Sequence, residues 1–353
     1  MRIKVVVATV DTLYRDRIGS ILQERYRGRF TLAMFSNIED AAQKANEIKA
    51  DILLADEDME VEETDLPKRC RYIVLIEKMG VRSIKGRTAV CKYQSIQSFY
   101  NDIVEVFSNQ TDEADIQIDS ESQKKTIITF TSSSGGVGVS TLAAAYTLHL
   151  AQEGTNALYL NLEEFGSSEL YFYADGKQDY SNVIYALELD NSSTFMRLEN
   201  ALRKTASGVY FIAPAKAALD MRDLNEERVD LLFENLKKSK LFDTIVVDMP
   251  FRFDDKTISQ IRRSDTAIFI SDGSLTANYK LKRVSDTLEI LSKSDEKLID
   301  CRCFLFYNRF SSKNGKKVEN TIFSEAGGLG RIENANPIEL ISLISSNKIF
   351  KNL

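Results

Sequence analysis

Apolar and polar residues alternate along the first 108 positions in the manner of consecutive strands and helices. Short apolar runs predict strands at residues 4–8, 31–35, 52–55, 72–76 and 88–91. Apolar residues at helical spacing predict helices at residues 14–25, 38–48 and 95–107. Strands and helices that alternate at this spacing form a parallel sheet covered on both faces, so we expect a doubly wound α/β domain over residues 1–108.

A second alternating region begins at Lys125, where an apolar run at residues 127–130 leads into a glycine-rich loop and an Ala-rich helical segment. Later apolar runs predict further strands, which begin at Ala157 and Phe242 and cover residues 266–270 and 303–306. The mostly apolar residues 340–353 favour a closing helix packed on the sheet. We therefore expect a second doubly wound α/β domain over residues 125–353.

The segment between the two regions, residues 109–124, has a different composition. Its acidic residues lie among Ser, Asn and Gln with few apolar positions: Asp112, Glu113, Asp115, Asp119 and Glu121. Such a segment cannot bury enough apolar surface to form a core, so we expect a solvated acidic linker.

Composition narrows the class of protein. The formal net charge of -6 argues against a chain that coats nucleic acid through its overall charge. The four cysteines have no metal-ligand spacing and the chain has one histidine, which favours a reduced, cytoplasmic protein without a zinc site. No apolar run approaches the roughly 20 residues of a membrane span. We therefore expect any position at the cell pole or at the inner face of the membrane to depend on partners.

The glycine-rich loop, residues 132–141, has the pattern of a phosphate cradle. Gly135, Gly136 and Gly138 allow the backbone to approach a ligand closely, and the helix that follows presents its N–H groups to the same point. The Ser140 hydroxyl lies where such loops hold Mg²⁺. The lysine that usually precedes this hydroxyl is replaced by Val139.

An apolar run that ends in Asp248-Met249-Pro250 lies about a hundred residues after the loop. An acid at the end of a buried strand can act on the metal of such a loop through water, or on its hydroxyl. The order and spacing therefore favour Asp248 as the metal-directed acid, and a plain strand-end acid is the alternative.

In the first domain, Asp56 follows the third strand and Lys92 follows the fifth. At these positions the domain resembles response-regulator receivers, whose fold is flavodoxin-like, in which the matching aspartate accepts a phosphoryl group and the matching lysine contacts it. Receivers also place an acidic pair after the first strand to hold Mg²⁺. Here those places are Ala8 and Thr9, with Asp11 too late in the chain.

The hydroxyl residue expected after the fourth strand is also missing, since Ile76 or Glu77 occupies its place. Phosphoryl transfer to Asp56 without a well-held metal would lack most of its charge stabilisation. We therefore expect an atypical receiver that serves docking or dimerisation, with Asp56 as an exposed acid in a turn rather than a phosphorylation site.

The order of motifs in the second domain resembles the MinD/ParA group of deviant Walker-A ATPases. The resemblance rests on the glycine loop, the strand end at Asn161 and Glu163, Asp248-Met249-Pro250, Asn308-Arg309 and the Asn336-Pro337 turn. With a receiver-like domain in front, the chain resembles TadZ/CpaE proteins, which help to localise and assemble tight-adherence (Flp-type) pili in bacteria. The resemblance implies a P-loop fold for residues 125–353, with ATP and Mg²⁺ as cofactors.

The chain departs from that family at its phosphate-binding cations. Ser134 replaces the signature lysine before the glycines, Val139 replaces the second lysine, and Asn161 and Glu163 stand where relatives have aspartates. A charge-assisted hydrogen bond contributes roughly 1.5 to 3 kcal/mol, so each loss weakens binding about ten- to a hundredfold. Backbone amides and Mg²⁺ can still hold ATP, but hydrolysis needs cations placed at the transition state. We expect weak or absent ATP hydrolysis.

The resemblance also implies a set of site residues. Those that contact the nucleotide are Ser134, Gly135, Gly136, Val137, Gly138, Val139, Ser140, Thr141, Asn308, Arg309 and Pro337. Ser140 and Asp248 are the implied metal ligands, and Glu163 with Asp248 are the implied catalytic residues. The alternatives are a strand-end cap for Asn308, a solvated helix-start acid for Glu163 and a helix cap for Ser140.

Two functions of different classes follow. The first is an ATP-binding localisation and scaffold protein that forms a nucleotide-stabilised homodimer and binds proteins of the pilus assembly or secretion machinery. The alternative is an active ParA/MinD-type ATPase in DNA partitioning or division-site placement. A structural protein with a relic loop is a third reading, and nucleotide affinity separates it from the first.

Direct binding of DNA or membrane is disfavoured. We expect the basic residues on later helices to form solvated faces rather than a surface for nonspecific DNA: Arg262, Arg263, Lys280, Lys282 and Arg283. The polar face of the final helix is not rich in Lys or Arg, as a membrane-binding amphipathic helix would be.

Overall fold

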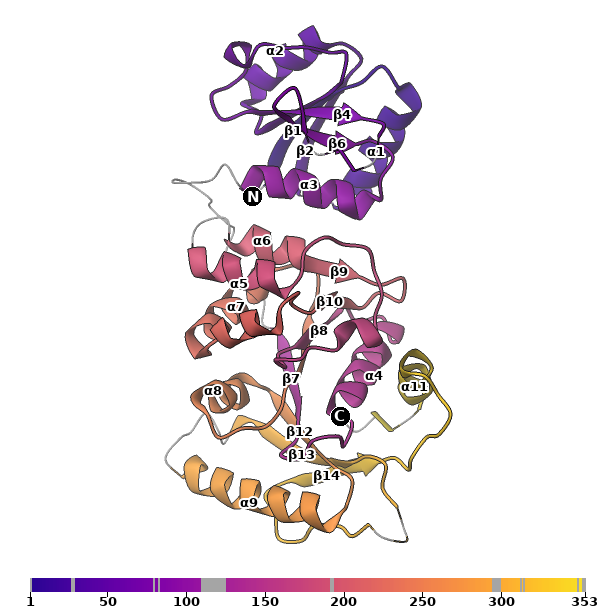
Figure 1. Cartoon of the computed structure of the whole chain (residues 1–353), viewed down its shortest axis with the longest axis vertical. Coiled ribbons are helices and arrows are strands. Elements are labelled where there is room, and N and C mark those ends of the chain that lie inside the picture. The colour runs from indigo at the N-terminus through magenta and orange to yellow at the C-terminus, as the bar shows by residue number, and fades with distance from the viewer. Residues whose placement is uncertain are drawn as a thin grey trace. The chain divides into compact units, whose positions relative to one another are not determined.

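The computed structural model describes residues 2–26, 29–78, 80–81, 83–108, 125–190, 194–293, 300–311, 313, 315–347 and 349–350. The acidic linker expected at residues 109–124 lies outside the described residues. The chain divides into two compact units, with Asp175–Lys177 and Asp190–Asn200 grouped with the first (Figure 1).

The first unit contains a sheet in the order β2-β1-β3-β4-β6-β5. All neighbours are parallel except β5 and β6, which form an antiparallel pair. The strands are β1 Ile3–Ala8, β2 Phe30–Phe35, β3 Ile52–Asp56, β4 Arg71–Ile76, β5 Ser83–Ile84 and β6 Arg87–Cys91. The helices are α1 Thr12–Arg25, α2 Ile38–Ile48 and α3 Ile96–Ser108, with a short 3-10 helix, η1, at Glu63–Asp65.

Two apolar layers cover this sheet. Residues of α1 and α3 form one core with Val5, Val7 and Leu54, while Ala41 and Ala45 of α2 form the other with strand residues that point the opposite way. Successive side chains of a strand face opposite sides, so continuous apolar strands need helices on both faces. The predicted doubly wound α/β class is confirmed.

The second unit contains a larger sheet in the order β14-β13-β12-β7-β11-β8-β10-β9, in which β9 and β10 are antiparallel. Its strands are β7 Thr126–Thr131, β8 Ala157–Asn161, β9 Leu202–Lys204, β10 Tyr210–Ile212, β11 Thr244–Asp248, β12 Thr266–Ser271, β13 Arg302–Tyr307 and β14 Ser324–Gly328. Its helices include α4 Val139–Gln152, α5 Tyr180–Leu189, α7 Glu226–Lys238, α8 Asp255–Arg263, α9 Leu275–Ser292 and α11 Pro337–Ser345; η2 Ser168–Leu170 and η3 Ala218–Asp223 are 3-10 helices. Helix α6, Thr194–Ala201, is grouped with the first unit except for its last residue.

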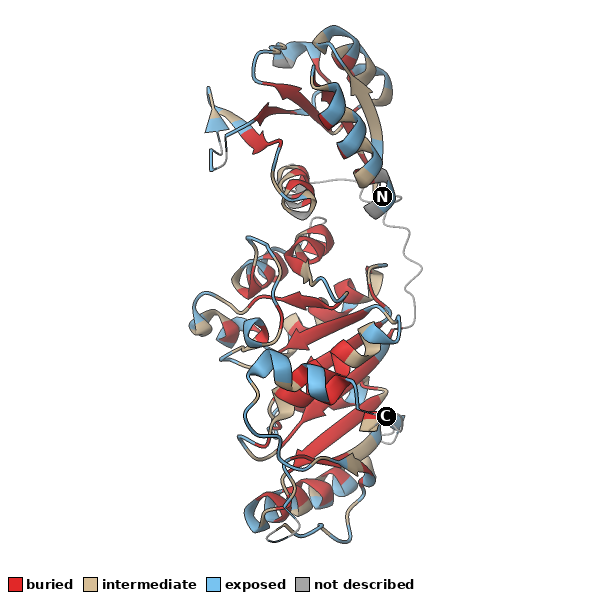
Figure 2. Cartoon of the chain, turned by 90° about the vertical axis from the view of Figure 1, so that its right-hand side faces the viewer, coloured by how far each residue is buried: buried red, intermediate tan, exposed pale blue. Residues whose placement is uncertain are grey.

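The strands of this sheet are mostly buried, and exposed residues lie on the helices and loops around them (Figure 2). One face packs Phe130 and neighbouring strand residues against α4 and α11, and the other packs Phe269 against α9. Strands β11 and β12 are buried throughout, and β7 is buried at every residue after its first, as expected for a parallel sheet covered on both faces.

The predicted closing helix is present as α11. Ile341 and Ile344 of α11 are buried, while Leu343 is exposed. The helix packs against α4 and shares a buried core with the strand residues Ile270 and Phe306, and its packing on α4 explains why α4 is buried on nearly all sides. Lys348 and Lys351 lie outside the described residues.

None of the helices in the described part of the chain is long and apolar enough to cross a membrane.

The central strand β7 lies between β11 and β12. The strands that follow β7 in the chain lie on both sides of it, so the glycine loop leaves the sheet at a topological switch point. Ligands of open α/β sheets bind at such a point, beyond the carboxyl ends of the strands. The register places Asp248 of β11 beside Phe130 and Asn161, which brings several predicted site residues to this edge.

Candidate functional site

The glycine loop folds tightly into the start of α4. Gly136 has a φ of 74° and Gly138 a φ of 91°, a left-handed conformation that glycine adopts without steric cost. A side chain at position 138 would also clash with the amide of Asn308. Close packing and backbone conformation therefore both require glycine at 138.

Two residues that follow β13 hold this loop from the side. Asn308 is buried and its Nδ2 donates a hydrogen bond of 2.8 Å to the Val137 carbonyl oxygen. The Nη1 atom of Arg309 donates a hydrogen bond of 2.8 Å to the Gly136 carbonyl oxygen. Asn308 therefore holds the loop in place, a role that was predicted neither by the nucleotide contact nor by the strand-end cap.

Asp248 ends β11 as a fully buried carboxylate. Its Oδ2 accepts hydrogen bonds from the Tyr159 hydroxyl at 2.6 Å and from Asn161 Nδ2 at 2.7 Å. Its Oδ1 has no hydrogen-bond partner among the described residues. Burial, and then the negative charge of Glu163, raise the pKa of Asp248 to about 7, against the lowering effect of the donors around it.

Glu163 brings the loop and this acid together. Its Oε2 accepts a hydrogen bond of 3.3 Å from the Ser140 hydroxyl and one of 3.4 Å from Asn161 Nδ2, and the Asn161 Oδ1 accepts from the Glu163 N–H at 3.0 Å. Ser140, Asn161, Glu163 and Asp248 therefore form one polar cluster, as their motifs suggested. Tyr159 was not predicted, although strand periodicity places it on the same face as Asn161.

A cavity of about 400 Å³ opens over the loop. Its lining combines the loop residues 132–136 and 138–141 with Glu163, Tyr171, residues 249–252 and Arg309. A second hollow of about 210 Å³ shares Thr141 and Arg309 with it, and is also lined by Asn308, residues 330–332, Ala335, Leu340 and Ile344. The predicted contact Pro337 lies in the first turn of α11, which Asn336 and Glu339 close with a capping box.

The cluster fits a hard divalent cation. It offers the Ser140 hydroxyl, the unpartnered Oδ1 of Asp248 and the Glu163 carboxylate, which are the oxygen donors that Mg²⁺ prefers. The described part of the chain contains no group of three His, Cys, Asp or Glu arranged to hold a metal by itself. Mg²⁺ at this place would therefore need further oxygen atoms from a bound phosphate and from water.

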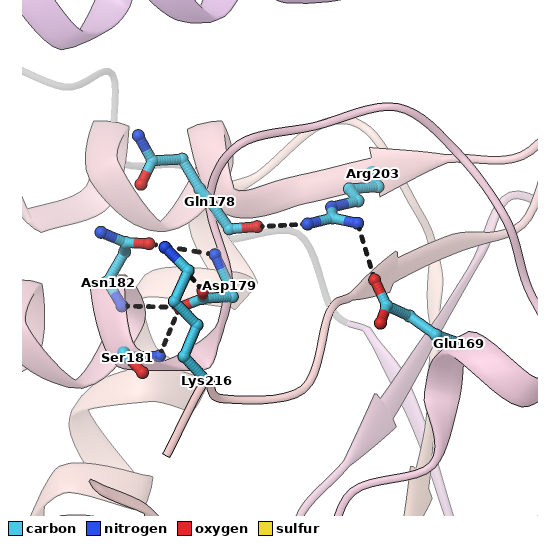
Figure 3. A network of polar contacts seen from close by, with 7 residues as sticks. All are labelled: Glu169, Gln178, Asp179, Ser181, Asn182, Arg203 and Lys216. Carbon is cyan, nitrogen blue, oxygen red and sulfur yellow. Dashed lines mark hydrogen bonds and ion pairs between the residues drawn. The ribbon is translucent and has the colours of Figure 1, made fainter.

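Beyond Glu163, a polar network fixes the segment that leads into α5 (Figure 3). The Asp179 Oδ1 accepts the N–H groups of Ser181 and Asn182, while Arg203 donates to the Gln178 carbonyl and to Glu169, each at 3.0 Å. The contacts of Asp179 cap the amino end of α5, and the contacts of Arg203 fix the segment that precedes this helix.

The receiver-like position of the first domain is closed. Asp56 is 4% exposed, and its Oδ1 forms an ion pair of 2.7 Å with Lys92 Nζ. Its Oδ2 accepts hydrogen bonds from the Thr9 hydroxyl at 2.9 Å and from the Val10 N–H at 3.1 Å. The prediction that Asp56 is an exposed acid in a turn is wrong, because the Thr9 that replaces a metal-binding acid draws its carboxylate inward.

Comparison with known proteins finds similarities in both parts of the chain. Residues 1–108 match the family model "TadZ-like, receiver domain". The septum site-determining protein MinD of Buchnera aphidicola subsp. Schizaphis graminum (strain Sg) is 27% identical over 201 residues, which cover 55% of this chain and 70% of that protein.

Solved structures match the second domain. A ParA family ATPase from Chlorobium tepidum TLS has a TM-score of 0.51 and 20% identity, covering 65% of this chain and 95% of its own. The septum site-determining protein MinD from Pyrococcus horikoshii OT3, complexed with Mg-ADP, has a TM-score of 0.46 and 15% identity, covering 65% and 99%. The ParA-family likeness shows the fold of the P-loop domain. The chain therefore combines a TadZ-like receiver domain with a second domain that has the fold of the ParA family ATPase.

Proposed function

We propose that the P-loop domain binds ATP with Mg²⁺ and that the protein is a nucleotide-regulated localisation scaffold, resembling those of tight-adherence pilus assembly. One observation carries this proposal. A glycine loop at the start of a buried helix lines a cavity of about 400 Å³ together with Glu163, and the polar cluster around Glu163 includes Asp248, a buried acid with an unpartnered oxygen.

The roles of the chain's own residues follow from this geometry. The loop amides and the first turn of α4 direct N–H groups at phosphate oxygens. Ser140 and Asp248 would hold Mg²⁺, which when bound neutralises charge on the phosphates. The second hollow, next to Asn308 and Leu340, is a place for the nucleoside. Its connection to the cavity through Thr141 and Arg309 supports a single ligand that spans both.

Hydrolysis is expected to be weak or absent. Ser134 and Val139 line the cavity where the two lysines of the motif would stand, and neither carries charge. Charge that develops on the phosphates in the transition state would meet amide dipoles there instead of ammonium groups. Glu163 and Asp248 remain the candidates for positioning an attacking water.

Two large apolar side chains favour a dimer closed over the cavity. Phe165 is 81% exposed and Phe253 is 53% exposed, and each directly follows a charged residue beside the site, Glu164 or Arg252. Exposed aromatic residues next to a polar site are typical of interaction surfaces. We propose a second copy of this chain as the occupant, so the double variant Phe165→Ser/Phe253→Ser should bind Mg-ATP but stay monomeric in sedimentation velocity.

As a scaffold, the protein would bind partners from the pilus assembly or secretion machinery. These partners would hold it in the cytoplasm at the cell pole or at the membrane. The TadZ-like receiver domain supports this reading. Its closed Asp56 site supports docking rather than phosphoryl transfer. The alternative is an active ATPase of the partitioning or division-site type, which the absence of both lysines disfavours.

Calorimetry with Mg-ATP on the full chain tests the proposal, with oligomeric state and phosphate release followed on the same sample. Binding that promotes a dimer with negligible phosphate release is the expected result. Rapid turnover would favour the alternative ATPase. No binding at millimolar nucleotide would leave the loop a structural relic.

A further inference from the structure

Arg309 is the cation best placed to act on a ligand in the cavity. Its guanidinium lies on the glycine loop through the bond to the Gly136 carbonyl oxygen, and its side chain lines both the loop cavity and the adjoining hollow. Gly136 lies between Ser134 and Val139, the two positions that lack lysine.

The guanidinium is also free to bind an anion. No carboxylate pairs with Arg309 among the described residues, and a neutral carbonyl is the acceptor of its one hydrogen bond there. A guanidinium carries five N–H donors in a planar fork that matches two phosphate oxygens. The other arginine of the cavity, Arg252, differs because its Nη1 already contacts Glu164 at 3.2 Å.

The backbone directs Arg309 to this place. Its φ of 56° lies in the left-handed region, which residues other than glycine seldom adopt. This turn directly after β13 aims residue 309 at the loop, while Asn308 is anchored to Val137. The side chain thus starts from a fixed point and needs little rearrangement to reach a phosphate.

We propose that Arg309 replaces the missing loop lysines as the phosphate-binding cation of the site, and that it does so by exchanging the Gly136 carbonyl for phosphate oxygens of the nucleotide. This inference rests on the proposed ATP binding. It adds a specific consequence, namely that selectivity for polyphosphate over monophosphate depends on a residue outside the loop.

The test compares Mg-ATP, Mg-ADP and AMP by calorimetry on the full chain. Arg309→Asn removes the charge with a residue that tolerates the left-handed backbone, and Arg309→Lys restores a charge without the fork. Arg283→Ala, on the exposed side of α9, is the control for loss of one positive charge. Thermal unfolding of each variant checks that the fold is kept.

We expect Arg309→Asn to weaken Mg-ATP binding ten- to a hundredfold, as for loss of one charge-assisted hydrogen bond, and AMP binding less than threefold. Arg309→Lys should recover part of the loss, and Arg283→Ala should change nothing. Equal weakening of ATP and AMP, or no effect of Arg309→Asn in a chain that does bind ATP, would overturn this inference alone. Absence of ATP binding by the unaltered chain would overturn the proposed function and this inference together.

Discussion

The two domains each end a central strand with a buried aspartate, and the two aspartates have opposite surroundings. Asp56 has a lysine, a hydroxyl and a backbone N–H around it, so both of its oxygens are compensated. Asp248 has no cation beside it within the described residues, one unpartnered oxygen and a second acid nearby. A buried carboxylate that is already paired serves the stability of the fold, whereas a buried carboxylate without a partner is a candidate ligand-binding group.

The different surroundings of the two aspartates depend on a few residues that follow the neighbouring strand in each sheet. In the first sheet, Thr9 follows β1 and donates its hydroxyl to the acid, which closes the site. In the second sheet, Val139 leaves the loop without a cation and Ser140 keeps its hydroxyl near Glu163. The receiver site has therefore kept its lysine, which pairs with Asp56, while losing its metal ligands, and the P-loop site has lost its cations while keeping the donors for a metal.

Removing the internal cation of the first site should have the largest effect. Lys92→Met leaves Asp56 buried and unpaired, which typically costs about 3 to 5 kcal/mol of unfolding free energy. Hydrogen exchange of the β3 amides, measured with urea unfolding, would localise the loss to the first domain. Lys44→Met breaks an exposed pair with Glu47 and should cost less than about 1 kcal/mol.

The double variant Asp56→Asn/Lys92→Met sharpens this prediction. Removing both charges should regain most of the stability, because no uncompensated charge is left in the core. If Lys92→Met alone costs as little as the surface control, the view of Asp56 as a closed structural pair is wrong.

The stability of the second domain should depend on pH because Asp248 has no cation beside it among the described residues. The folded-state pKa of Asp248, about 7, lies above its ordinary value of 3.8. Between these values the folded state keeps a proton that the unfolded chain has released, so the free energy of unfolding falls as pH rises from about 4 to 7. The loss should be about 4 kcal/mol and fully present at pH 8.

Asp248→Asn should remove this pH dependence and make the protein more stable than the unaltered chain at pH 8. Chemical unfolding at pH 4, 6 and 8 without Mg²⁺ measures it. Asp243→Asn, an exposed acid just before the same strand, is the control. A variant whose stability falls with pH as steeply as that of the unaltered chain would show that Asp248 is ionised and accommodated without cost.

Much of this architecture could be predicted from sequence because it depends on local pattern. Buried parallel strands are continuous apolar runs, so β3, β4, β7 and β12 begin and end within about one or two residues of the prediction. The glycine loop is recognisable because its three glycines and Ser140 are adjacent in the chain.

Features that depend on distant residues could not be predicted in this way. The burial of Asp56 follows from Thr9 and Lys92, which are far from it in sequence and meet it only in the folded sheet. The Tyr159 hydroxyl on Asp248 and the brace of Asn308 on Val137 are likewise contacts between separate strands and loops. The short strands β5 and β9 were also missed, since a run of two or three residues carries no periodicity.

Placing a cation in the second site should give the smallest effect of the three predictions. It would give Asp248 a nearby positive charge, as Asp56 already has. Val139 opens α4 and lines the cavity. A lysine there can keep the apolar contact with its stem while its ammonium reaches the phosphates.

We expect Val139→Lys to tighten Mg-ATP binding about tenfold, equivalent to about 1.4 kcal/mol, and to lower the pKa of Asp248. Calorimetry at pH 8 measures the affinity, and Val139→Met controls for side-chain length. If lysine binds no more tightly than methionine, the cavity over the loop does not hold the phosphates, and the contrast between the closed and the open aspartate loses its functional meaning.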